Sequence, residues 1–114
     1  MTDTAGHAYR DVDLPRRRRW YTAAELDGYQ LTRSTEHATD GAWDVIIAGE
    51  RVGQLRPAYG ATGRRSGWQA WAAPEGWPIP HRGKGKAARS KTGAVADVVF
   101  DLRMRWENRR PRPR

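Results

Sequence analysis

The sequence predicts an α+β fold: a small antiparallel sheet of three to four strands in a meander, with a C-terminal helix packed on one face and disordered basic termini. Three patterns support this prediction. Apolar and polar residues alternate around 43–56, a strand rich in tryptophan follows at 68–73, and an apolar stripe of helical period runs over 95–106. These elements are enough for one small two-layer domain.

A short helix is expected at the start of that domain, over residues 22–27. Thr22 and Glu25 have the spacing of a capping box, in which the threonine hydroxyl and the glutamate satisfy free backbone amides. Gly28 follows where such a helix should end. Residues 29–35 then alternate and contain threonines, which predicts the first strand.

Residues 43–56 predict a β-hairpin. Its turn falls at Ala48-Gly49 or at Gly49-Glu50, and the pattern does not decide between the two. Because a slip of one residue inverts a strand, it is also open whether Gln54 or Leu55 faces the core.

The second half of the sheet is expected to contain long loops. Glycines surround Arg64 and Arg65 and no apolar pattern is present, so residues 57–67 are predicted to form a mobile, basic hairpin loop. The strand at 68–73 places Trp68 and Trp71 on opposite faces. Residues 74–93 then form a loop of unusual length, and such loops are generally functional or disordered.

The last predicted element is a helix over residues 91–108, with Ser90 or Thr92 as its N-cap. An apolar stripe along this helix is fit to lie across the sheet. Phe100 and Met104 lie four residues apart on another face, which one sheet cannot cover, so they are a candidate partner interface. The stripe consists of Val95, Val98, Val99, Leu102 and Trp106.

The domain organisation follows from these elements. We expect one α+β domain over residues 20–108, a disordered arm over 1–19 and a disordered basic tail over 109–114.

Positive charge is distributed unevenly along the chain. Residues 1–42 carry six basic and seven acidic side chains, whereas residues 43–114 carry fifteen basic and six acidic ones. Such asymmetry indicates a polyanionic partner, with nucleic acid as the leading candidate. A GC-rich coding sequence would also raise the arginine content. The stronger signal is therefore the stretch 79–93, which has five cations and no carboxylate.

The candidate site residues lie in and around the two basic loops. Clustered cations neutralise phosphates and release counterions, which gives strong and salt-sensitive affinity. Tyr59 and two tryptophans are interleaved with these cations and could stack on bases, although a core role for the tryptophans is the stronger interpretation. The predicted phosphate contacts are Arg64, Arg65, Arg82, Lys84, Lys86, Arg89 and Lys91. The candidate base-reading or stacking residues are Arg51, Gln54, Arg56, Gln69, Trp71 and Trp77.

Signals for an enzyme or a metal site are poor, and no cofactor is expected. The chain has no cysteine, which excludes disulfides and cysteine-based zinc sites, and its three histidines lack metal-ligand spacing. Asp97 and Asp101 lie four residues apart, but Arg105 follows Asp101 by four, which favours surface ion pairing over acid–base chemistry. No apolar run is long enough to span a bilayer, so a cytoplasmic protein is expected.

The leading functional hypothesis is a small nucleic-acid-binding protein, with DNA favoured over RNA and duplex DNA favoured as the ligand. It would be an accessory or regulatory factor of a GC-rich bacterial genome, plasmid or phage. In architecture the expected fold resembles integrase arm-binding and AP2-type domains, which lay a three-stranded sheet into the DNA major groove. The alternative is a protein–protein adapter or inhibitor that uses the open sheet face with Phe100 and Met104, as a homodimer or with an acidic partner. The test between them is whether the two basic loops meet on one surface.

Overall fold

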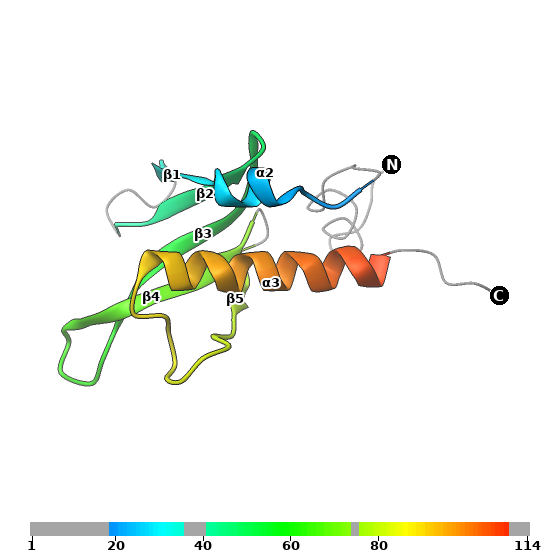
Figure 1. Cartoon of the computed structure of the whole chain (residues 1–114). Helices are drawn as coiled ribbons and strands as arrows, with labels where there is room; N and C mark the ends of the chain where they lie inside the picture. Colours follow the sequence, from blue (N-terminus) through cyan, green and yellow to red (C-terminus); the bar gives the residue numbers. More distant parts are fainter. Residues whose placement is uncertain (1–18, 36–40, 74–75, 110–114) are drawn as a thin grey trace, which may run out of the picture.

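The computed structural model describes residues 19–35, 41–73 and 76–109. It has a five-stranded antiparallel sheet in the order β1-β2-β3-β4-β5, with the long C-terminal helix packed across it (Figure 1). The predicted class and meander are confirmed, with one strand more than expected. Of the predicted disordered arm 1–19 and tail 109–114, residues 1–18 and 110–114 lie outside the described residues, whereas Arg109 is the last residue of α3, so the tail was predicted to begin one residue too early. The elements are α2 (Ala23–Asp27), β1 (Gln30–Arg33), β2 (Trp43–Ile47), β3 (Glu50–Tyr59), β4 (Arg65–Ala72), β5 (Pro78–Ile79) and α3 (Lys91–Arg109).

The predicted capping box of the first helix is present. The Glu25 amide donates to the Thr22 hydroxyl at 3.1 Å, and the Thr22 amide donates to the Glu25 carboxylate at 2.9 Å. Gly28 is the C-cap. Since no residue of α2 is fully buried, these caps and the partly buried Leu26 hold the helix in place.

The β2–β3 hairpin turns at Ala48 and Gly49, which settles the choice left open by the sequence. Both residues have positive φ, 51° and 81°, as a type I′ turn requires. Ile47 and Glu50 close the turn, and the register shifts between Val45 and Ile46.

Strands β3 and β4 extend into the segment 57–67 that was expected to be a mobile loop, so that prediction was wrong. Tyr59 still pairs with Arg65, which leaves only residues 60–64 outside the strands. Pro57 is tolerated inside β3 because β2 pairs with β3 only as far as Leu55, and edge stretches accept proline.

The long segment after β4 is also more ordered than the sequence indicated. Pro78 and Ile79 form β5, which pairs with Trp71 and Ala70. Further along, Ala88 makes a bridge to Trp68, so the loop follows the edge of β4. These pairings turn the predicted 74–93 loop into a strand and an attached basic loop, residues 80–90.

Helix α3 covers the sheet with the predicted stripe, and this contact forms the core. Val98 and Leu102 are fully buried, and Val95 and Trp106 are nearly so. A Cβ at Gly53 would lie 2.6 Å from a methyl of Val98, so only glycine in β3 allows this close approach. Each large apolar side chain buried here contributes about 1.5–3 kcal/mol.

The two faces of the sheet therefore differ. Helices α2 and α3 both lie on one face, as Figure 1 shows, with Leu26 and Val98 packed against the same core. Leu55 faces this core, while its neighbour Gln54 lies on the opposite face. Among the described helices none is long and apolar enough to cross a membrane.

Candidate nucleic-acid interface

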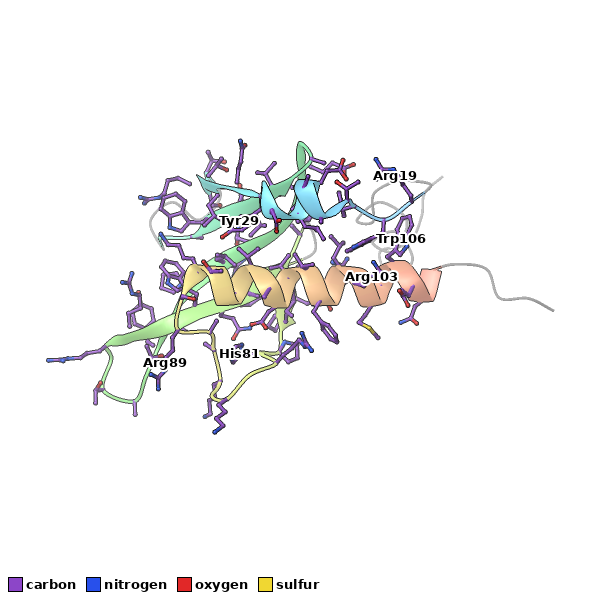
Figure 2. The ribbon with its side chains drawn as sticks, in the orientation of Figure 1. Arg19, Tyr29, His81, Arg89, Arg103 and Trp106 are labelled. Atoms are coloured by element: carbon purple, nitrogen blue, oxygen red, sulfur yellow. The ribbon has the colours of Figure 1, made fainter. Side chains whose placement is uncertain are left out.

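The two basic loops meet at one end of the sheet. The Trp68 amide donates to the Ala88 carbonyl at 2.7 Å, and the Ala88 amide donates back at 3.1 Å. Gly67 permits this contact, because a Cβ there would lie 2.1 Å from the Ala88 carbonyl oxygen. Figure 2 shows Arg89 beside the β3–β4 hairpin as a result.

A groove of about 800 Å³ separates the hairpin from the basic loop, and we call it the hairpin groove. Tyr59, Gly60 and Ser66 line its hairpin side. Three cations line the opposite side, namely Lys84, Lys86 and Arg89.

A second depression, of about 440 Å³, lies next to the groove, and we call it the tryptophan hollow. Cations from β1, β4 and α3 line it together with two indole rings. Lys91 Nζ lies 4.3 Å from the Trp43 ring and 5.1 Å from the Trp68 ring. Arg33 lies 5.1 Å from Trp43, and Arg65 lies 5.2 Å from Trp68. Each such contact is worth about 0.5–1 kcal/mol at an exposed site, so the indoles hold three like charges near one another.

The start of α3 adds to the positive potential of the tryptophan hollow. The helix begins at Lys91 and has no acidic residue in its first turn. Ser90, one of the two predicted caps, accepts the Gly93 amide at 3.0 Å. The helix dipole places about half a positive charge at this end, which adds to the charge of Lys91.

Described carboxylates line neither the groove nor the hollow. Most are engaged elsewhere: Glu50 accepts from the Tyr21 hydroxyl at 2.8 Å, and Asp101 pairs with Arg105 at 3.0 Å as the sequence predicted. Among the described residues the charges are thus separated, and cations without neighbouring carboxylates gather at one end of the sheet.

Arg82 and Arg64 depart from the predicted phosphate-contact set. Arg82 lies over the Phe100 ring at 3.7 Å, beside α3, and so belongs to neither the groove nor the hollow. Arg64 is exposed in the hairpin turn and lines neither depression. The other five predicted contacts are brought together, and Arg33 joins them.

Asp97 was expected on the helix surface, but it is buried. Its carboxylate accepts from the Arg82 amide and contacts His81 Nδ1 at 2.8 Å. This pair ties the start of the basic loop to α3, as the position of His81 in Figure 2 shows. In the described part of the chain, no three metal-ligating side chains come together.

Five of the six candidate base readers lie on the open sheet face, whereas Trp77 packs against the core on the covered face, beside Arg105 of α3. The polar side chains on the open face bond within the protein. Gln54 is 2% exposed, donates to Ser34 and Asp44 at 3.1 Å each, and accepts from Arg56 at 2.7 Å. Arg51 lies 3.6 Å from the Asp44 carboxylate.

The remaining readers are similarly occupied. Gln69 donates to the Ile79 carbonyl at 2.6 Å. The Trp71 ring is covered by Arg56 at 4.0 Å, and its Nε1 is buried without a hydrogen-bond partner among the described residues. On the covered face, Arg105 lies 5.3 Å from the Trp77 ring. The open face is thus an internally bonded surface that offers few free donors to a base edge.

Phe100 and Met104 lie on the outer side of α3 and are 40% and 44% exposed. Phe100 lines a shallow groove of about 500 Å³ between α2 and α3, which Leu26 and Val99 also line. The predicted apolar spot is therefore present on the surface.

Arg33 and Trp43 are site residues that sequence reasoning missed. Arg33 was assigned to a strand, and Trp43 to the core by its alternation. The register of β1 against β2 places Arg33 opposite Trp43, which would have indicated this pair. That register is known only once the two strands are paired.

Comparisons with protein-family models, curated proteins and solved structures found no match to this chain.

Proposed function

We propose that this protein binds nucleic acid through the hairpin groove and the tryptophan hollow. One observation carries the proposal: six cations from four segments line two adjoining depressions, and no described carboxylate lines either. They are Arg33, Arg65, Lys84, Lys86, Arg89 and Lys91.

A phosphodiester backbone suits this arrangement. Its charges are closely and regularly spaced, so one strand can place successive phosphates along a row of cations. Repulsion among Arg33, Arg65 and Lys91 disfavours the free state, and a phosphate between them relieves it. Arginine adds bidentate contacts to phosphate oxygens.

The proposed contact is to the backbone and not to base edges. The side chains that could read bases, Gln54 and Gln69 above all, already bond within the protein. Binding should therefore depend weakly on sequence and strongly on salt. Six phosphate contacts correspond to a slope of about −4 to −5 in a plot of log K against log salt.

The test is fluorescence anisotropy with labelled DNA oligonucleotides at several salt concentrations. Changing Lys84 and Lys86 to Gln removes two contacts from the hairpin groove. Each phosphate contact raises the binding constant about 5- to 8-fold at 0.1 M salt. The double variant should therefore bind about 25- to 60-fold more weakly, and the slope of log K against log salt should become shallower by about 1.5 to 2.

The matched control removes the same charge elsewhere. Arg19 and Arg103 are exposed and lie towards the other end of α3 from Arg89 (Figure 2). Changing both to Gln should leave affinity within about threefold. Equal losses in the two double variants would mean that net charge alone, and not this surface, drives binding, and affinity that does not respond to salt would refute the proposal.

A second candidate function is an adapter that self-associates through α3. The observation in its favour is the exposure of Phe100 and Met104 beside the groove between α2 and α3. Light scattering during size-exclusion chromatography should then show a dimer that persists at 0.5 M salt and is lost in Phe100→Asp. A monomer for the unmodified chain would exclude this candidate.

A further inference from the structure

We infer that the nucleic acid bound here is single-stranded, with one unpaired base stacked on Tyr59 and the flanking phosphates in the hairpin groove and the tryptophan hollow. This inference rests on the proposed function and specifies its ligand.

Tyr59 is the wall that the two depressions share. It is the last residue of β3, and its backbone is held by pairing with Arg65. Its side chain is 64% exposed. A single exposed aromatic residue is ordinary on a protein surface, but Tyr59 stands between two sets of cations.

The Tyr59 ring is available for stacking, unlike the aromatic rings around it. Within the described residues it has no cation or ring contact, whereas Lys91 lies over the rings of Trp43 and Trp68. Trp71 carries Arg56 on its ring. Phe100, the other exposed aromatic ring among the described residues, has Arg82 at 3.7 Å. Of the aromatic side chains at the basic end, Tyr59 therefore offers the free face.

A strand that crosses Tyr59 can use both sets of cations. On one side it meets Lys84, Lys86 and Arg89, and on the other Arg33, Arg65 and Lys91. In a duplex the bases are paired and stacked inside the helix, so placing one on Tyr59 requires unpairing, which costs a few kcal/mol. An unpaired strand avoids that cost and should bind more tightly. This inference replaces the expectation of duplex DNA.

The experiment compares three fluorescein-labelled probes: a 12-mer of deoxythymidine, a 12-mer of uridine, and a blunt 12-base-pair DNA duplex. Removing a stacking ring weakens single-strand binding by about 5- to 150-fold per base. Tyr59→Ala should therefore lose at least fivefold on the single strands and less than twofold on the duplex. Tyr59→Phe keeps the ring and should bind as the unmodified protein does. The uridine probe shows whether the sugar matters.

A second readout detects stacking directly. An oligonucleotide with 2-aminopurine at its centre should lose fluorescence when its base stacks on the ring, in the unmodified protein and in Tyr59→Phe but not in Tyr59→Ala. Thermal unfolding of both variants verifies that they fold, as expected for so exposed a side chain.

The outcomes separate this inference from the proposal beneath it. If Tyr59→Ala binds the single strands within twofold of the unmodified protein, or if the duplex binds more tightly than both, the inference is wrong while backbone binding stands. If neither the single strands nor the duplex bind in a salt-dependent way, both are wrong.

Discussion

Replacing Gly67 by alanine should release the basic loop from strand β4. The new Cβ would lie 2.1 Å from the carbonyl oxygen of Ala88 and 3.0 Å from its carbonyl carbon. These are backbone atoms, which cannot rotate away as the end of a side chain can. The loop must move, and the two hydrogen bonds between Trp68 and Ala88 are then lost.

The size of the effect follows from these contacts. Two backbone hydrogen bonds contribute about 1 kcal/mol each, and the buried Ala88 methyl group contributes a further ~0.8 kcal/mol. The free energy of unfolding should therefore fall by about 2–3 kcal/mol. For a domain of this size, that lowers the melting temperature by roughly 8–24 °C.

The assay is urea unfolding followed by tryptophan fluorescence, together with hydrogen exchange at the Trp68 and Ala88 amides. Gly60→Ala is the matched control, because its Cβ would meet nothing closer than 3.9 Å in the same hairpin. Gly67→Ala should lose protection at both amides, whereas Gly60→Ala should keep it. If Gly67→Ala unfolds within 0.5 kcal/mol of the unmodified protein, with both amides still protected, the loop does not depend on this close approach.

Three further substitutions test the fold that carries the site. Ala48→Asn should raise the free energy of unfolding by about 0.5–1 kcal/mol in urea titrations, because asparagine tolerates the positive φ of a type I′ turn better than alanine; a loss would contradict the turn assignment. Gly53→Ala should lower it by about 1–3 kcal/mol, since the new methyl group would overlap Val98, and an unchanged melting temperature would show that α3 does not pack so closely. Gln54→Ala should cost about 2–4 kcal/mol, because three hydrogen-bond partners lose their buried amide; a cost under 0.5 kcal/mol, measured by calorimetry, would place Gln54 outside any structural network.

Local patterns in the sequence predicted the elements that depend on neighbouring residues. The Thr22–Glu25 capping box requires two residues three apart, and both are visible in the sequence. The apolar stripe of α3 repeats with the period of the helix itself, so it predicted both the helix and its buried face.

Predictions failed where a residue's place depends on a partner that no local apolar pattern marks. Residues 57–67 have no apolar pattern of their own, yet they extend β3 and β4 because each strand supplies the other's hydrogen bonds. Asp97 was expected on the surface for the same reason: its partner His81 lies sixteen residues away. No local pattern records either pairing.

Composition and periodicity were enough to predict an α+β domain with cations concentrated in acid-poor stretches, because both are properties of the chain alone. That five of the predicted phosphate contacts share a surface with Arg33 and Tyr59 became visible in the folded chain. Strand register and the bridge between Trp68 and Ala88 bring these residues together across the sheet. A surface of this kind depends on distances between residues that are remote in sequence, and those distances are set when the backbone hydrogen bonds of the sheet are satisfied.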